Sequence, residues 1–429
     1  MDWKFENRKW LYPGIGLKRW IFLLVISFVL ISAGIAVLVD YQLISHLENI
    51  ILDFFSPLIR GDVSYWFDLI VALVLIVSGL LGINYSLKGA FKGIYQLELH
   101  DNVVDRLYEK NVLQKGPRVV ALGGGTGLSN LLRGLKKYSS NLTAIVTVAD
   151  DGGSSGKLRD ELGMLPPGDI RNCLVALADA EPLMQDLFQH RFESEGPLEG
   201  HSFGNLFIAS LTEVLGDFED AVKESSKVLA IRGKVLPATN EDIHLGAVYA
   251  DKTLKIGESG IPDLDKRIEK VFLNPSTCRP SGEALESIRS ADIIVIGPGS
   301  LYTSIIPNLL VKEIAYAIKK SDAIKIYVSN VMTQPGETSN YSVSDHIKAI
   351  FNHSVEGLFD YVIANKEEGS EELILRYKEE GAYRVLLDEE KIEELGIKVI
   401  KQDLLTDQGY IRHNPDKLAR IILETARKG

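Results

Sequence analysis

Residues that could do chemistry gather between positions 118 and 172 of this chain. One apolar run, RVVAL, ends in the glycine-rich sequence GGGTG, and a second run, AIVTV, ends in ADDGGSSG. Glycine lets the backbone approach a phosphate closely, and a helix that starts after such a turn offers free N–H groups to anions. A hydrophobic core does not require so many Gly, Asp and Ser residues together. The stretch therefore predicts a site that holds phosphates and the polar parts of a nucleotide.

The first turn consists of Gly123, Gly124, Gly125, Thr126 and Gly127. A strand precedes it and a helix over 128–137 follows it, and the carboxyl ends of strands are where α/β folds bind ligands. The turn lacks the Gly-Lys-Ser/Thr of a Walker A loop and the third glycine of the dinucleotide fingerprint. We expect it to bind an anion or a nucleotide, and a purely structural turn is the alternative.

The second turn consists of Asp150, Asp151, Gly152, Gly153 and Ser154. Adjacent carboxylates at a strand end could hold Mg²⁺ or accept hydrogen bonds from ribose hydroxyls. A lone Asp-Gly is usually a surface Asx turn, which is the alternative reading of this pair.

Two nearby loops lead into helices. In LPPGDIRN, Asp169 has the context of a helix N-cap, whereas Arg171 and Asn172 are better candidates for ligand contacts. In HSFGN, we expect Asn205 to position a ligand, because a nucleophilic Ser-His pair there would lack its third member.

A second glycine turn follows the apolar run 293–296. It consists of Gly297, Pro298, Gly299 and Ser300. The next strand ends at Asn330, before the loop 333–338. Because the carboxyl ends of parallel strands share one edge of a sheet, phosphates could be held from both glycine turns.

Short β-branched runs alternate with helical stretches in the rest of the chain. We expect strands at 119–122, 144–148, 293–296, 325–329, 361–364, 384–387 and 397–400. Several are continuously apolar, as strands buried on both faces of a parallel sheet are. The pattern predicts the α/β class, with a Rossmann-like three-layer α/β/α sandwich and a mainly parallel sheet. Between 228 and 273, the runs VLAIRGKVLPAT and GAVYADKTLKIGE predict antiparallel hairpins inserted beside the site.

Composition narrows the classes of function. The chain has 429 residues and a formal net charge of -11, whereas a general nucleic-acid-binding protein needs a basic surface. We therefore expect no nucleic acid among its partners. Its cysteines, Cys173 and Cys278, are far apart and its histidines do not cluster, so neither a disulfide framework nor a zinc site is expected.

Two long apolar runs, 21–39 and 69–87, lie near the N-terminus. Each is long enough to cross about 30 Å of hydrocarbon. We predict a membrane anchor over 1–87 with transmembrane helices at about 20–39 and 67–87, a juxtamembrane helical linker over 88–116, and a nucleotide-binding domain over 117–429. Lys and Arg residues precede the first span and follow the second, with only Arg60 between them, which predicts a cell-membrane protein whose large C-terminal domain is cytoplasmic.

The motifs together resemble those of one family. GGGTGLSNLLRGLK, TVADDGGSSGKLRDE, LPPGDIRN, HSFGNL, IGPGSLYTSIIPNLL, MTQPGET and RHNPDKLA occur in this order between about 118 and 428. They are similar to motifs of the YvcK-like gluconeogenesis factors, which are relatives of the CofD-like phospholactate transferases. The membrane segment lies outside the resemblance.

The resemblance implies a Rossmann-like core that binds UDP-sugars such as UDP-N-acetylglucosamine (UDP-GlcNAc). It also implies a regulatory role linked to gluconeogenic growth, cell-wall precursor supply and cell shape. The matching motifs imply that the glycine turn and the aspartate pair belong to the nucleotide site. They imply the same for Tyr377 in RYKEEGA and Arg412 in IRHN. A tyrosine can stack on uracil and an arginine can clamp a diphosphate, whereas a core aromatic and a surface charge are the alternatives.

We therefore expect a membrane-tethered regulator that binds a UDP-sugar, with protein partners in cell-wall synthesis and with a homodimer left open. The alternative is a transferase that uses Mg²⁺ to move a phospholactyl-type group from a nucleotide diphosphate donor to a deazaflavin acceptor. An NAD-dependent enzyme is disfavoured by the failed dinucleotide pattern. The motif residues include no convincing nucleophile or general base, which favours the regulator.

Overall fold

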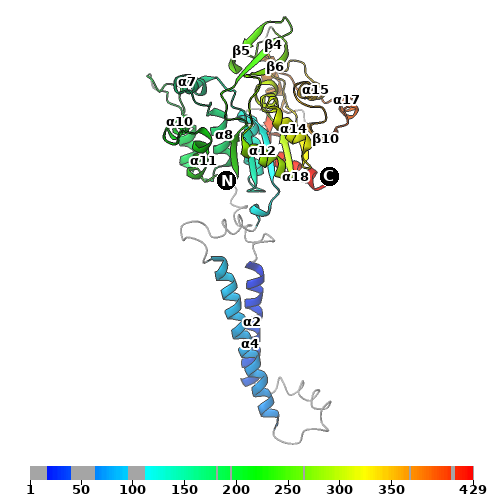
Figure 1. Ribbon diagram of the computed structural model, residues 1–429. Coiled ribbons are helices and arrows are strands. Elements are labelled where there is room, and N and C mark those ends of the chain that lie inside the picture. The colour runs from blue at the N-terminus through cyan, green and yellow to red at the C-terminus, as the bar shows by residue number, and fades with distance from the viewer. Residues whose placement is uncertain are drawn as a thin grey trace. The chain divides into compact units, whose positions relative to one another are not determined.

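The computed structural model describes residues 17–39, 63–94, 112–179, 182–193, 196–263, 266–366, 369–406 and 411–428. Contacts divide the chain into two compact units, Met1–Gln114 and Lys115–Gly429. In the first unit the described elements are two helices, α2 (Leu17–Val39) and α4 (Val63–Ile94), which lie along one another (Figure 1).

Small residues let α2 and α4 approach closely. A Cβ atom on Gly34 would come within 2.7 Å of the side chain of Ile76, and one on Gly79 within 2.5 Å of the side chain of Ile31. The Ser86 hydroxyl donates a 2.6 Å hydrogen bond to the backbone carbonyl of the residue at position 20. Contacts of this kind, through small residues and hydroxyls, are typical of helices that associate within lipid.

The outer faces of the two helices are apolar and exposed. The exposed side chains include Ile21, Phe22, Val25, Phe28 and Val29 on α2, and Ile70, Leu73, Val74, Leu80 and Leu81 on α4. The windows Trp20–Val37 and Leu69–Lys88 have mean hydropathies of 2.7 and 2.2, and by length and composition they could cross a membrane. Helix α4 continues to Ile94, into the predicted linker. Most of that linker (95–111), the connection 40–62 and the basic N-terminus lie outside the described residues.

The second unit is built on a parallel sheet of seven strands in the order β10-β9-β8-β7-β1-β2-β3. These strands are β1 (Val119–Gly123), β2 (Leu142–Val146), β3 (Lys234–Pro237), β7 (Ile293–Ile296), β8 (Ile324–Val328), β9 (Tyr361–Asn365) and β10 (Lys398–Gln402). The central strands β1 and β7 are buried at every residue, which explains their continuously apolar sequences. The predicted α/β class and mainly parallel sheet are confirmed.

Helices cover the sheet in two groups that form the outer layers of the sandwich (Figure 1). One group consists of α6 (Gly125–Leu135), α8 (Gly168–Leu177) and α18 (Pro415–Lys428). The other consists of α12 (Gly282–Ser290), α13 (Ile306–Leu310), α14 (Lys312–Lys320), α15 (Val343–His353) and α17 (Glu389–Glu394). The remaining helices are α7 (Gly153–Leu162), α9 (Pro182–Gln189), α10 (Phe203–Leu215), α11 (Phe218–Val228) and α16 (Glu371–Glu379), with short helical turns at Leu113–Lys115, Glu258–Gly260 and Leu301–Ile305.

Two small antiparallel sheets stand beside the main one. The first consists of β4 (His244–Tyr249), β5 (Leu254–Ile256) and β6 (Ile268–Asn274), where the sequence predicts an inserted hairpin. The second pairs β11 (Leu405–Thr406) with β12 (Arg412–His413).

Two strand predictions are wrong. The run VLAIRGKVLPAT forms no antiparallel hairpin, because its strand β3 pairs in parallel with β2 at the edge of the main sheet. Residues 384–387 form only isolated bridges, to Met332 and Ser342. In both places the strand partner is distant in sequence, so local β-propensity could not reveal the pairing.

The chain reverses its progress through the sheet at β1. It passes from β1 to β2 and β3 on one side, and it later returns to β7 and β8 on the other side. In such sheets a crevice opens outside the carboxyl ends of the two strands at the reversal, and ligands bind there. Both glycine turns lie at this crevice, because they follow β1 and β7.

The two glycine turns are in direct contact. A Cβ atom on Gly127 would lie 2.5 Å from the backbone oxygen of Pro298, so a larger residue would push the turns apart. The Asn308 side chain supports the contact by donating a 2.9 Å hydrogen bond to the Gly123 carbonyl. The Gly297 N–H donates a 2.8 Å bond to the Leu122 carbonyl.

We predict that Gly127→Ala lowers the free energy of unfolding by about 1–3 kcal/mol, because the added methyl group overpacks the contact. Gly282→Ala is the matched control, since a Cβ atom at this helix start meets nothing within 4 Å. Chemical denaturation of both variants measures the difference. Equal stability of Gly127→Ala and the unsubstituted protein would contradict the contact between the turns.

Candidate functional site

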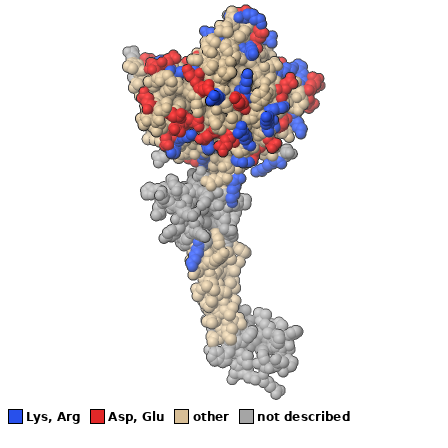
Figure 2. All heavy atoms as spheres, in the orientation of Figure 1, with Lys and Arg blue, Asp and Glu red and all other residues tan. Residues whose placement is uncertain are grey.

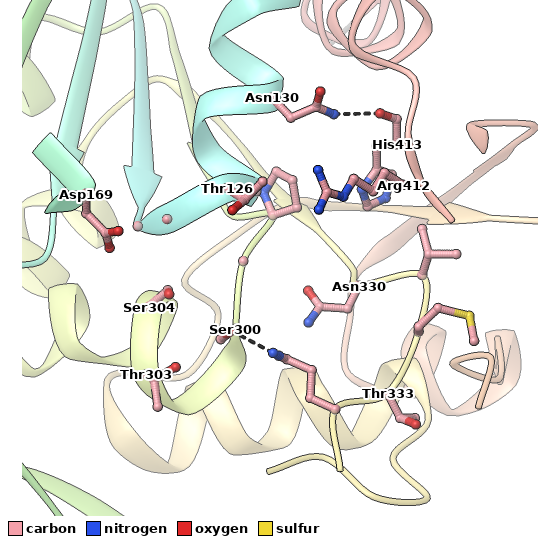
Figure 3. A pocket seen from close by; sticks show the side chains of 18 of the residues that line it. Thr126, Asn130, Asp169, Ser300, Thr303, Ser304, Asn330, Thr333, Arg412 and His413 are labelled. Carbon is pink, nitrogen blue, oxygen red and sulfur yellow. Dashed lines mark hydrogen bonds between the residues drawn. The ribbon is translucent and has the colours of Figure 1, made fainter. Parts of the chain in front are cut away.

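A cavity of about 500 Å³ opens between the two glycine turns (Figure 3). It is lined by Gly124, Gly125, Thr126, Gly127, Asn130, Thr147, Asp150, Asp169, Glu258, Pro298, Gly299, Ser300, Thr303, Ser304, Asn330, Val331, Met332, Thr333, Gln334, Tyr377, Ile411, Arg412 and His413. These residues follow β1, β2, β5, β7 and β8, or lie on α8, on α16 and at β12. The cavity is thus assembled at the edge of the sheet from segments far apart in the sequence.

The N-terminus of α6 forms one wall. Its N-cap, Gly124, has no side chain to bond the free N–H groups of the first turn. Gly125 has a φ of +59°, which favours glycine. The Asp169 carboxylate lies close to this glycine, and the Gly125 N–H acts against burial by lowering the pKa of Asp169. The positive end of a helix therefore faces the cavity, which suits an anionic group.

Carboxyl groups gather at one end of the cavity, where Asp150, Asp169 and Glu258 line it. Burial, followed by the negative charge of Asp150, raises the pKa of Asp169 to about 7. Burial and the charges of Asp150 and Asp169 raise the pKa of Glu258 to about 8. Because these carboxyl groups repel one another when ionised, the acidic end holds protons close to neutral pH.

The second wall is a π-helical turn over Leu301–Ile305, which follows the second glycine turn. Such turns are frequent at functional sites. The buried Glu337 carboxylate supports it from behind by accepting hydrogen bonds from the Tyr302 N–H (3.3 Å) and the Thr303 hydroxyl (3.2 Å). Burial raises the pKa of Glu337 to about 7. The wall that carries Thr303 is thereby held against the cavity.

Arg412 is the only lysine or arginine among the described residues that line the cavity. It lies on β12, and the Asn130 side chain on α6 fixes this strand by donating a 2.6 Å hydrogen bond to the His413 carbonyl. Its guanidinium points toward Thr126 at the first glycine turn (Figure 3). Burial lowers the pKa of His413 to about 4, so this imidazole adds no positive charge at neutral pH.

The other end of the cavity is apolar. Val331, Met332, Tyr377 and Ile411 line it and belong to a hydrophobic cluster that is separate from the main core. This cluster lies where α16 covers the segment after β8. A ring among aliphatic side chains offers a surface on which a planar group can stack.

The cavity wall includes many of the predicted site residues, namely Gly124, Gly125, Thr126, Gly127, Asp150, Asp169, Pro298, Gly299, Ser300, Tyr377 and Arg412. Gly123, Asp151, Gly152, Gly153, Ser154, Arg171, Asn172, Asn205 and Gly297 are not part of the wall. The residues outside the wall lie at strand ends or in the loops and helices that surround it.

A buried polar network contains several of the residues outside the wall. The Ser154 hydroxyl lies 3.1 Å from His201 Nδ1 and accepts a 3.1 Å hydrogen bond from the Asn205 side chain. The Arg171 guanidinium donates to the hydroxyl of Ser202, the N-cap of α10. These bonds join α7, α8 and α10, so the side chains hold together the loops around the cavity.

Sequence reasoning missed Asn130, Thr147, Glu258, Ile411 and His413, all of which line the cavity. Glu258 follows the β4–β5 hairpin, and no local motif marks it because only the fold brings it to the rim. Its neighbour Ser259 is held there by a 2.8 Å hydrogen bond from its N–H to the Asp151 carboxylate. The sequence could have indicated Asn130, because it lies one helical turn after Gly127 and so on the same side of the helix.

The carboxylates suit a hydrated cation better than a closed metal cage. Within the described ranges, no group of three or more His, Cys, Asp or Glu side chains is arranged to hold a metal ion. Asp150 and Asp169 both line the cavity and interact electrostatically. Mg²⁺ commonly takes one or two carboxylates and completes its shell with phosphate oxygens and water, so these residues fit it.

Comparison with known proteins points to one family. The family model described as 2-phospho-L-lactate transferase CofD matches residues 119–405. A putative gluconeogenesis factor of Nostoc sp. is 46% identical over 422 residues, which are 97% of this chain and 92% of that protein. The alignment therefore reaches into the region of α2 and α4.

Relatives from Bacillus species match a smaller share of this chain, but almost the whole of their own length. The gluconeogenesis factor of Bacillus subtilis is 50% identical over 313 residues, which are 73% of this chain and 99% of that protein. The crystal structure of a UPF0052 family member from Bacillus halodurans has a TM-score of 0.70 and 52% identity, covering 72% of this chain and 99% of its own.

We predict that stability falls as the pH rises from about 4 to about 7, because the raised pKa of Asp169 lets the folded state hold a proton that the unfolded state releases. Asp169→Asn should reduce this dependence of stability on pH without abolishing it. The pKa values of Glu258 and Glu337 are also raised, so these residues contribute with the same sign. Thermal unfolding at about pH 5 and about pH 8 measures it. The exposed Asp416→Asn is the control, and an unchanged slope in Asp169→Asn would contradict the prediction.

Proposed function

The chain belongs to the CofD family and, within it, to the gluconeogenesis factors, and on that premise we propose that its cavity binds a UDP-sugar such as UDP-GlcNAc. The protein then acts as a regulator that reports the supply of a cell-wall precursor during gluconeogenic growth. The observation that carries the proposal is the arrangement of the cavity, in which two glycine turns and one arginine lie between an acidic end and an apolar end.

The middle of the cavity suits a diphosphate. The N-terminus of α6 faces it, and Arg412 points toward the same turn (Figure 3). Arginine can hold two phosphate oxygens with parallel N–H donors, and helix N-termini add a partial positive charge. Asn130 ties the strand of Arg412 to α6, so the two groups form one clamp.

The two ends suit the other parts of the ligand. Tyr377 and its aliphatic neighbours offer a stacking surface for the base. Asp150, Asp169 and Glu258 offer hydrogen-bond acceptors, and donors when protonated, for the hydroxyl groups of a sugar. The apolar end, the cationic middle and the acidic end of the cavity therefore match the base, the diphosphate and the sugar of the ligand, in that order.

A second candidate function is a transferase, which the description of the matching family favours. In this reading Asp150 and Asp169 would hold Mg²⁺, and the ion would neutralise charge on the phosphoryl oxygens. Such a reaction runs largely on positioning and electrostatics, and it needs no protein nucleophile. The Ser154–His201 pair supports neither reading, because its hydroxyl is buried in the network around Asn205.

We further propose that α2 and α4 tether the protein to the cell membrane, with the second unit in the cytoplasm. Support comes from their length, their exposed apolar outer faces and their small-residue contact. The related Nostoc protein aligns along this region, whereas the Bacillus subtilis protein aligns with only 73% of the chain. A tether would keep the cavity near membrane-bound steps of wall synthesis.

We expect the detergent-purified chain to bind UDP-GlcNAc in the micromolar range by calorimetry. Arg412→Ala should weaken binding by about tenfold to a hundredfold, because a charge-assisted hydrogen bond contributes about 1.5–3 kcal/mol. Arg420→Ala, an exposed arginine on α18, is the matched control. No heat at millimolar ligand would contradict the regulator. Group transfer from a GDP-linked donor in the presence of Mg²⁺ would favour the transferase.

We expect the full chain to stay in the membrane fraction after alkaline carbonate extraction, because two apolar helices insert into the bilayer. A variant that begins at Lys115 should be released into the soluble fraction. Release of the full chain by carbonate would contradict insertion and indicate a peripheral association.

A further inference from the structure

We propose that Asn330 recognises the base, by accepting a hydrogen bond from the N3–H of uracil and donating one to the adjacent ring carbonyl. This inference rests on the proposed binding of a UDP-sugar in the same cavity. It adds a specificity-determining contact, because the glycine turns and Arg412 can hold the diphosphate of any nucleotide.

Asn330 occupies the boundary between the polar and apolar parts of the cavity. It follows β8 and directly precedes Val331 and Met332, which line the apolar end. Its side chain points into the space between Ser300 and Arg412 (Figure 3). A base stacked on Tyr377 would therefore present its polar edge toward this amide when its diphosphate lies under Arg412.

The amide has an unused acceptor. The Oδ1 atom of Asn330 is buried and accepts no hydrogen bond from any described residue. A buried acceptor without a partner costs about 1–3 kcal/mol, so a ligand that donates to it gains affinity. Uracil offers an N–H flanked by carbonyl oxygens, which complements the adjacent acceptor and donor of a carboxamide.

The backbone around Asn330 is fixed before any ligand binds. The Ser329 N–H donates a 3.0 Å hydrogen bond to the Ile363 carbonyl. On the other side, the Val331 carbonyl accepts a 3.0 Å bond from the Val385 N–H. Because the backbone on both sides of Asn330 is held, little backbone ordering is needed when a ligand binds. A preorganised contact therefore loses less affinity to ordering.

Gln334 is the other cavity amide with a buried, unpartnered oxygen. Its side-chain nitrogen donates a 2.8 Å hydrogen bond to the Ser300 hydroxyl, which ties it to the second glycine turn. That turn belongs to the phosphate part of the cavity. We therefore assign base recognition to Asn330, and Gln334 provides a comparison within the same cavity.

The test compares UDP with 3-methyluridine diphosphate, in which a methyl group replaces the N3–H. Calorimetry on the detergent-purified full chain should show about tenfold weaker binding of the methylated ligand. Asn330→Ala should bind UDP about tenfold more weakly, and it should bind the two ligands equally because the amide is gone and the methyl group has space. Gln334→Ala should keep the full difference between them.

The inference is overturned if the unsubstituted protein binds both ligands equally. It is also overturned if Asn330→Ala keeps the difference between them. A difference lost in Gln334→Ala instead would assign the base to that residue. Absence of binding of both UDP and UDP-GlcNAc by the unsubstituted protein would refute the proposed function itself. The comparison of ligands on the unsubstituted protein tests recognition of the N3–H without any variant, and Gln334→Ala tests the other cavity amide even if Asn330→Ala misfolds.

Discussion

The contact between the two glycine turns is the constraint on which the site depends. Gly127 approaches the backbone of Pro298 so closely that no side chain fits between them. The parallel pairing of β1 with β7, the strands at the reversal of the sheet, puts their ends on one rim, where the two turns touch. The N-terminus of α6 and the π-helical turn then face each other across the cavity, and the segments after β8 and around β12 close it.

The electrostatics of the cavity follow from this geometry. The helix end and Arg412 attract anions, whereas Asp150, Asp169 and Glu258 repel them. Asp169 also lies beside Gly125, whose N–H is one of the free donors at the start of α6. This carboxylate would oppose an anionic ligand, and protons or Mg²⁺ would reduce the repulsion.

The charged side chains on the surface of the second unit differ in their surroundings from the carboxyl groups of Asp169 and Glu258 in the cavity (Figure 2). Figure 2 shows Lys, Arg, Asp and Glu side chains interspersed over the face of the second unit in view. Inside the cavity, by contrast, burial and the nearby negative charges raise the pKa values of Asp169 and Glu258. Burial turns ordinary acidic residues into groups that titrate near neutral pH.

The sequence by itself determined the α/β class, the central strands and both glycine turns, because buried parallel strands are continuously apolar and close backbone approach demands glycine. It also predicted that Asp150, Asp169 and Ser300 belong to the site, because they come after strands whose carboxyl ends share one edge of the sheet. Only the tertiary structure decided that Glu258 reaches the cavity while Asp151, Ser154 and Asn205 support its surroundings. These assignments depend on which segments meet across long stretches of chain, and local sequence carries no record of such pairings.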